Sequence, residues 1–428
     1  MDNSRLSGGR RMTRRTVITA AAAGAAALVT PPAQAAAGPP APRRAGAVRP
    51  RHTITARPLS NGDGSHPLVQ VRDVNRLGHV LGMVDLGEGA PLRWPSAIWA
   101  DGSVTLLPAP LAGAADSGAV RLNDHDQAVG YCVVSGNQSA VLWTAGVPRV
   151  LDIGTVEANA TALNNLGQAV VHGWNVKSGE TATWNTVCLV DGASVTAVAP
   201  PATTAGMTFA GQAVDDHGAI AIVAGRPQSA DRAGFVWRDG AVVADFTDLD
   251  GSSSFAGFEG IGGMNARGQV VGDYYAPYAA RPGAHTFVWT DGAFTDVVGL
   301  GDGNSTVLTF GWHPVNDLGD VAGVSDLGSG VRRAFLWSGG RTRDLGTLGG
   351  ATAFPVGVNN RREVAGNSAL PDGSSRAFLW RAGEMIAITP PAGYASTAAE
   401  AITEQGDVVG RATTADRSRS TYLRWTVG

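Results

Sequence analysis

The polar side chains best suited to chemistry share one repeated position, three residues before a short turn that begins with Asn or Asp. They are Arg72, Gln212, His313 and Glu400, and the same position elsewhere holds Val, Thr or Gly. Imidazole titrates near neutral pH, so His313 and Glu400 could exchange protons while Arg72 and Gln212 orient a substrate. The structural alternatives are an Arg72–Glu400 ion pair and a His313 that only packs.

A second group of candidates is aromatic. Seven of the eleven Trp recur at one position of a repeat, and we expect them to pack in the core. The remaining four, together with several Tyr and Phe, are predicted in loops or at strand ends, where aromatic rings suit sugar stacking, an apolar metabolite or a protein contact. Packing of these rings onto the domain is the alternative. The candidate ligand-binding residues are Trp94, Trp174, Trp184, Tyr274, Tyr275, Trp312, Phe354 and Tyr394.

A repeat of four predicted strands must position both groups. The phrase at 333–337, Arg-Ala-Phe-Leu-Trp, returns at 376–380, with looser copies that end at Trp237 and Trp289. Each copy has a short strand ending in Asn or Asp, a turn usually closed by Gly, a second strand, the Phe-x-Trp strand and a fourth strand. Asn or Asp before Gly is favourable turn chemistry because Gly accepts positive φ.

Both repeat markers count eight copies, at intervals of 41 to 51 residues. Self-similarity at this period, with four strands a copy, is typical of a propeller blade. The last copy stops after its third strand, and the segment 54–59 resembles a missing fourth strand. We therefore predict an all-β, eight-bladed β-propeller of four-stranded blades over residues 52–428, with the N-terminal strand completing the last blade. An open β-solenoid is the alternative.

These repeats resemble those of the HAF family of probable extracellular repeat proteins. The resemblance rests on the phrase at 376–380, on Asp-Leu-Gly-Thr-Leu-Gly-Gly at 344–350 and on Val-Asn-Asp-Leu-Gly-Asp-Val-Ala-Gly at 315–323. It covers essentially all of residues 52–428. The resemblance implies a repeat architecture and extracellular location, and it carries no common activity.

The two faces of such a propeller differ in sequence. One face carries the short, uniform turns between strands one and two and between strands three and four. The other face carries the loops between strands two and three and those between blades, and nearly all length variation lies there. Because variable loops on a rigid scaffold usually carry function, we expect a ligand on this variable face.

The N-terminal region predicts export. Residues 1–35 combine Arg14–Arg15 with an apolar stretch and a small-x-small motif that ends at Ala35, the pattern of a cleaved twin-arginine signal. Residues 36–51, rich in Ala, Pro and Arg, are predicted to be a disordered linker. No run is long enough for a transmembrane helix. Localisation is therefore expected to be extracytoplasmic.

Charge argues against nucleic-acid binding. Residues 1–51 hold nine of the 33 basic and one of the 36 acidic residues, which leaves 24 against 35, or −11, for residues 52–428. Nucleic-acid binding requires a basic surface.

Cys132 and Cys188 fall in neighbouring repeats, and either a disulfide or two buried thiols fits that spacing.

Catalytic motifs are not recognisable in the sequence. It contains no Gly-x-Ser-x-Gly, His-Glu-x-x-His, phosphate-binding loop or zinc spacing, and we expect no cofactor or metal. The leading hypothesis is an exported, non-catalytic, monomeric propeller that binds polysaccharide, a secreted metabolite or an extracellular protein. The alternative is a secreted cofactor-independent lyase, cyclase or hydrolase with its active site in the central funnel.

Overall fold

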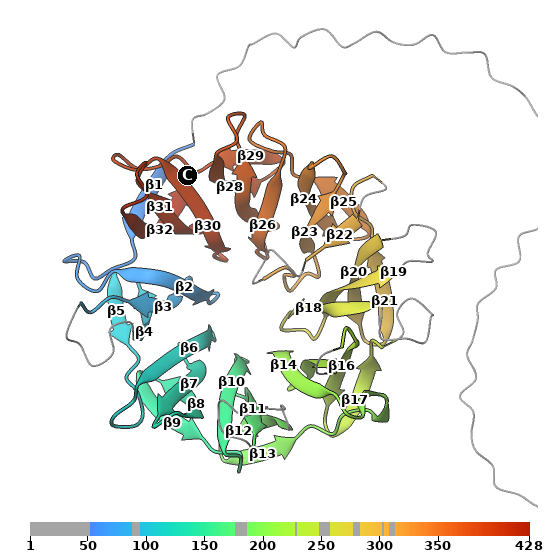
Figure 1. The fold of residues 1–428 in the computed structure, drawn as a ribbon. Helices are drawn as coiled ribbons and strands as arrows, with labels where there is room; N and C mark the ends of the chain where they lie inside the picture. The colour runs from blue at the N-terminus through green and yellow to red at the C-terminus, as the bar shows by residue number, and fades with distance from the viewer. Residues whose placement is uncertain are drawn as a thin grey trace, which may run out of the picture. The chain divides into compact units, whose positions relative to one another are not determined.

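The computed structural model describes residues 52–87, 95–175, 186–226, 229–247, 257–276, 283–301, 304–307 and 313–428. These residues form eight antiparallel sheets of four strands each. The sheets contact their neighbours in chain order, and the eighth contacts the first, so they close into a ring around a central channel (Figure 1). The predicted eight-bladed β-propeller is confirmed.

The blades follow the chain. Blade 1 contains β2 (Leu68–Val74), β3 (Val80–Val84), β4 (Ser96–Ala100) and β5 (Ser103–Leu106); blade 2 contains β6 (Asp116–Leu122), β7 (Ala128–Val134), β8 (Asn137–Thr144) and β9 (Val147–Leu151); blade 3 contains β10 (Glu157–Leu163), β11 (Ala169–Trp174), β12 (Thr186–Asp191) and β13 (Ser194–Ala197); blade 4 contains β14 (Thr208–Val214), β15 (Ile220–Gly225), β16 (Arg232–Arg238) and β17 (Ala241–Asp245). A short 3₁₀ helix, η1 (Ala202–Thr204), joins blades 3 and 4.

The second half repeats the pattern. Blade 5 contains β18 (Phe258–Met264), β19 (Val270–Ala276), β20 (Gly283–Thr290) and β21 (Ala293–Val297); blade 6 contains β22 (Asn304–Thr306), β23 (Val321–Asp326), β24 (Arg332–Ser338) and β25 (Arg341–Asp344); blade 7 contains β26 (Ala353–Val358), β27 (Val364–Ala369), β28 (Ser375–Arg381) and β29 (Glu384–Ala387); blade 8 contains β30 (Ser396–Ile402), β31 (Val408–Thr413) and β32 (Ser420–Val427), completed by β1 (Ile54–Pro58).

Ring closure occurs as predicted. β1 pairs antiparallel with β32 over five residues, from Ile54 opposite Val427 to Pro58 opposite Leu423. The outer strand of the last blade therefore comes from the N-terminal part of the domain. Because β1 covers the edge of β32, the pairing removes an exposed sheet edge.

The core lies between adjacent blades. All seven repeated Trp are buried, and Trp143 and Trp425 are fully so. One cluster joins Val236 and Phe246 of the blade 4 segment to Phe258 and Trp289 of blade 5. The repeated phrase is thus core, as expected, and its four consecutive apolar residues are all buried in β24 and β28. No helix among the described residues has the length and hydropathy needed to cross a membrane.

A β-bulge interrupts the innermost strand of seven blades, at the same place in each. The register shifts across the position three residues before the turn, as between Gly211 and Ala213 in blade 4 and between Ala399 and Ala401 in blade 8. The same shift occurs in β2, β6, β10, β18 and β26. A bulge changes the direction of the extra residue. The polar residues predicted to carry chemistry are therefore largely bulge residues.

Candidate functional site

The four polar residues predicted to form a catalytic cluster have separate surroundings. Glu400 pairs with Arg411 of its own blade at 3.7 Å, and Arg72 donates to Met83 Sδ at 3.5 Å. The expected Arg72–Glu400 ion pair is therefore not formed. In a regular strand, the residue three positions before the turn and the residue one position before it would point to the same face. The β-bulge interrupts this alternation in the strands that carry Arg72 and Glu400. Gln212 lies in a cleft between blades 4 and 5.

His313 reaches across the channel. Its Nε2 lies 3.1 Å from Oδ1 of Asp73, which belongs to blade 1, whereas His313 belongs to the blade 6 segment. The imidazole is about half exposed and Asp73 is buried. Asp73 also accepts backbone N–H bonds from Val74 and Leu122 at 2.9 Å. Although burial opposes it, these contacts, led by His313, hold the pKa of Asp73 below its usual value.

A cavity of about 190 Å³ lies in the channel at the end where the first turns meet. Its apolar lining consists of the residue before the turn in every blade: Val74, Leu122, Leu163, Val214, Met264, Val315, Val358 and Ile402. Each of these residues also belongs to an inter-blade cluster or packs against one, as predicted. That these residues also line the channel is an additional finding.

The first residue of the turn links each blade to the next. In six blades it is an Asn whose Nδ2 donates to the carbonyl oxygen of the corresponding turn residue one blade further on, at 2.8 to 3.1 Å. The Oδ1 of the same side chain accepts backbone N–H bonds from its own turn, as Asn316 does from Leu318 and Asp320. Asp215 and Thr403 occupy this position in blades 4 and 8.

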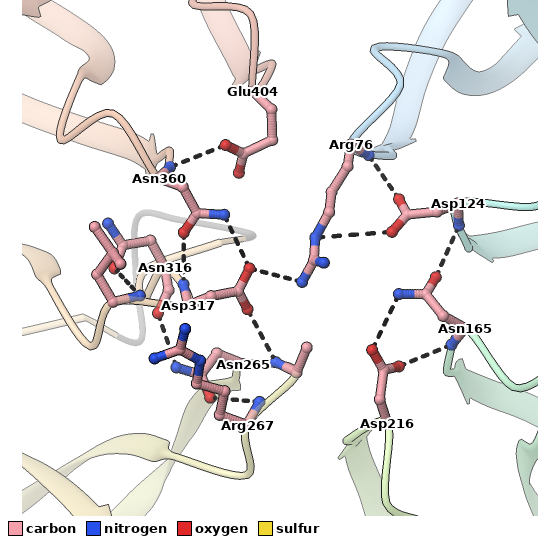
Figure 2. A network of polar contacts seen from close by, with 12 residues as sticks. Arg76, Asp124, Asn165, Asp216, Asn265, Arg267, Asn316, Asp317, Asn360 and Glu404 are labelled. Carbon is pink, nitrogen blue, oxygen red and sulfur yellow. Dashed lines mark hydrogen bonds and ion pairs between the residues drawn. The ribbon is translucent and has the colours of Figure 1, made fainter.

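The second turn residue forms another set of blade-to-blade links (Figure 2). In six blades its backbone N–H donates to the second turn residue's side chain in the next blade, at 2.8 to 3.2 Å. Arg76 Nη2 and Asp317 Oδ2 meet at 2.6 Å, which joins blade 1 to blade 6 a second time. Asn360 Nδ2 donates to the same carboxylate oxygen at 2.9 Å. The residues of this ring are Arg76, Asp124, Asn165, Asp216, Ala266, Asp317, Asn360 and Glu404.

The ring is acidic, with four carboxylates and one guanidinium among its eight members. The pKa of Glu404 is raised, chiefly by burial, although the N–H bond from Asn360 opposes the shift. Asp317 raises the same pKa by repulsion, while Arg76 and His313 lower it. Because most of these polar groups bond to one another, the ring primarily holds the blades together.

The aromatic candidates are only partly available to a ligand. Trp174, a ligand-binding candidate, is buried and donates from Nε1 to Glu157 at 2.5 Å, which matches the packing alternative. Tyr274 stacks on His285, with centroids 5.2 Å apart, and Tyr275 is 44% exposed.

Two further aromatic candidates are half-buried. Tyr394 lies beneath the guanidinium of Arg419 at 5.2 Å and its hydroxyl bonds Thr421. Phe354 is on β26. Trp94, Trp184 and Trp312 lie outside the described residues.

A cleft of about 300 Å³ opens on the variable face between blades 4 and 5, and we call it the 4–5 cleft. Its walls come from the first residues of β14, β16 and β18 and the last residues of β15. They are Thr208, Phe209, Ala210, Gln212, Val223, Ala224, Gly225, Arg232, Glu259, Gly260 and Ile261. Arg232, Glu259 and Gln212 are exposed, and within the described part of the chain none of the three side chains has an ion-pair or hydrogen-bond partner.

The cysteines and metal candidates add little to the site. Cys132 and Cys188 are both free and buried, so of the two alternatives the structure has the thiols, and burial raises the pKa of each. Among the described residues, no group of three or more His, Cys, Asp or Glu is arranged to hold a metal ion.

Comparison with known proteins yields structural similarity only. No family model and no curated protein matches the chain. The β-propeller domain of the Trilobed protease from Pyrococcus furiosus aligns over 75% of this chain and 98% of its own, with 11% identity and a TM-score of 0.44. Dipeptidyl peptidase 4 from Porphyromonas gingivalis aligns over 83% of this chain and 56% of its own, with 10% identity and a TM-score of 0.48. SapL1 lectin aligns over 64% of this chain and 97% of its own, with 13% identity and a TM-score of 0.31.

Sequence reasoning missed the channel ring and most of the 4–5 cleft. The ring is readable in part, because a polar residue follows the turn-opening residue in seven of the eight copies. The uniform turns resemble scaffold, however, and their spacing does not show that they meet around the axis. The cleft combines residues from four strands of two blades, and Arg232 and Glu259 have no repeated counterpart that would distinguish them.

Proposed function

We propose that the protein is an exported, non-catalytic binding propeller that holds a small polar molecule in the 4–5 cleft. The observation that carries this proposal is the set of three exposed polar side chains in that cleft, Gln212, Arg232 and Glu259, without partners among the described residues. Binding sites characteristically combine a mostly preformed hollow with a few polar groups that fix orientation. A secreted metabolite fits this volume better than a polysaccharide or a protein.

The local sequence explains why the hollow exists. Ala210, Ala224 and Gly225 line it, and their small side chains leave space that larger residues would fill. Phe209 provides an apolar wall, and its ring is fixed by an edge contact with the buried Phe235, at a centroid distance of 6.1 Å. A wall supported by the core needs little rearrangement when a ligand binds.

The binding site can be tested with a mixture of small polar compounds observed by NMR in the presence of the whole protein. We expect saturation transfer to some compounds, lost in Ala210→Trp, which fills the cleft. Arg238→Ala is the matched control, because Arg238 lies at the opposite end of β16. Equal saturation transfer in wild type and Ala210→Trp would contradict the site.

Export belongs to the same proposal and is supported by Arg14–Arg15 and the apolar stretch that follows. N-terminal sequencing of the protein recovered outside the cytoplasm should begin at Ala36. Replacement of both arginines by lysine should leave the precursor inside. Recovery of an uncleaved precursor outside the cell would contradict this route.

The enzyme alternative retains one supporting observation, the half-exposed His313 held by the buried Asp73. A carboxylate that orients an imidazole is the arrangement used in general base catalysis. A panel of chromogenic esters, glycosides and phosphates tests this alternative, with His313→Ala as the comparison. Turnover that His313→Ala abolishes would favour the enzyme; turnover unaffected by His313→Ala would remove this residue from it.

A further inference from the structure

We infer that the 4–5 cleft binds a zwitterion of the α-amino-acid class, with the carboxylate at Arg232 and the ammonium group at Glu259. This inference rests on the proposed function and specifies its ligand. It begins from the charges of the cleft: one guanidinium and one carboxylate line the same hollow, and within the described part of the chain they form no ion pair with each other.

Two opposite charges in one cleft favour a ligand that carries both. An anion would be attracted by Arg232 but repelled by the like charge of Glu259. A cation would be attracted by Glu259 but repelled by Arg232. A zwitterion gives each side chain an opposite charge, which is the general condition for electrostatic complementarity. Gln212, with donor and acceptor atoms on one amide, can bond either end of such a ligand.

The backbone places Arg232 at the cleft. Gly225 pairs with Arg232 across β15 and β16, and a Cβ on Gly225 would lie 2.9 Å from Arg232 Nη1. The guanidinium therefore lies close to the backbone of Gly225. Because Arg232 is exposed and has no partner among the described residues, its planar guanidinium is available to form the two parallel bonds that a carboxylate accepts.

The volume and the apolar wall limit the rest of the ligand. About 300 Å³ corresponds to roughly ten water molecules, enough for an amino acid of about a dozen non-hydrogen atoms. Phe209, Val223 and Ile261 line the cleft and suit an apolar or aromatic side chain. L-Phenylalanine has both charges, a suitable size and an aromatic side chain, and it is the probe of choice.

The test compares three ligands of one shape by calorimetry on the whole protein. L-Phenylalanine carries both charges, phenethylamine lacks the carboxylate and 3-phenylpropanoate lacks the ammonium group. We expect each singly charged compound to bind at least about tenfold more weakly than L-phenylalanine, the usual effect of losing one charge-assisted bond. Arg232→Ala should abolish the preference for L-phenylalanine over phenethylamine. Glu259→Gln should abolish the preference for L-phenylalanine over 3-phenylpropanoate.

Arg238→Ala is the control and should keep the wild-type affinities. Equal binding of L-phenylalanine and either singly charged compound would overturn the zwitterion assignment. A different result would separate the two proposals: L-phenylalanine does not bind, but other compounds of the NMR mixture bind and Ala210→Trp abolishes their binding. The zwitterion assignment would then be wrong, and the proposed binding function of the 4–5 cleft would be supported. If no compound binds in the cleft, both fall.

Discussion

The turn-opening Asn shows how one side chain serves two purposes in this fold. Its Oδ1 satisfies backbone N–H groups of its own turn, while Nδ2 bonds the backbone carbonyl of the next blade. Only an amide carries both an acceptor and a donor at these places. The preference of turns for Asn or Asp explains the acceptor Oδ1. It does not explain the donor Nδ2, which the bond to the next blade requires.

Asn316→Asp should lower the free energy of unfolding by roughly 1–3 kcal/mol, because the carbonyl of Asn359 loses its donor in a buried site. The new carboxylate would also face Asp320, whose Oδ2 lies 3.0 Å from Asn316 Nδ2. Urea unfolding at pH 7 measures the change. Asp215→Asn is the matched control: it keeps the acceptor and adds a donor, so no loss is expected. A loss from Asp215→Asn and none from Asn316→Asp would contradict this role.

His172 gives the fold an acid-sensitive position. It is buried on β11 and accepts the Gly211 N–H at Nε2, 2.7 Å away, and burial lowers its pKa from 6.5 to about 4. The unfolded chain takes up this proton below about pH 6.5, whereas the folded protein resists it until about pH 4. Stability is therefore fully retained above about pH 6.5 and falls as the pH drops toward about 4, by roughly 2–3 kcal/mol.

Comparison of wild type with His172→Gln by urea unfolding at about pH 7 and about pH 4.5 isolates this effect. Gln can accept the same N–H bond and does not titrate in this range. The variant should lose less stability between the two pH values than wild type does. An identical loss in both proteins would show that His172 is not responsible.

At the scale of the elements, the bulge explains the glycine in the second strand. A Cβ on Gly82, Gly130 or Gly410 would lie 2.2 Å or less from a carbonyl oxygen of the adjacent bulged strand. The second strand can approach the bulge this closely because the side chain is absent. The repeated Gly thus has a packing reason that periodicity does not reveal.

Arg424 joins the last blade to the first. Its guanidinium bonds Asp407 at 2.6 Å and the carbonyl of Gly78 at 3.2 Å, and both charged side chains are largely buried. Arg424→Met should lower the free energy of unfolding by about 3 kcal/mol, since it leaves the Asp407 carboxylate buried without its partner. Chemical denaturation measures the loss.

The control for Arg424 is Arg332→Met. Arg332 pairs with Asp326 at 3.3 Å on the surface, where such pairs contribute at most about 1 kcal/mol. A similar loss in the two variants would contradict a specific role of Arg424 in closing the ring.

At the scale of the whole molecule, closure depends on β1. Deletion of residues 1–58 would remove β1 and expose the edge of β32, which favours association between chains. We expect a lower Tm and a concentration-dependent increase in size by light scattering. Deletion of residues 1–51 keeps β1 and serves as the control. A monomer with unchanged Tm after the longer deletion would show that β1 is dispensable.

The sequence predicted the architecture far better than the site. Blade number, strand order and the pairing of β1 with β32 follow from a repeat that records each element eight times. The site depends on features that the repeat does not record: the pairing of Glu400 with Arg411 of its own blade, a His313–Asp73 contact across the channel, and a cleft built from two blades. Trp174 resembled a loop aromatic, yet its bond to Glu157 holds it in the blade.

The most direct test of the account is a crystal structure of the protein with L-phenylalanine at saturating concentration. We expect ligand density in the 4–5 cleft, with the carboxylate at Arg232, the ammonium group at Glu259 and the ring against Phe209. Density in the central channel beside His313, or an empty cleft at that concentration, would contradict it.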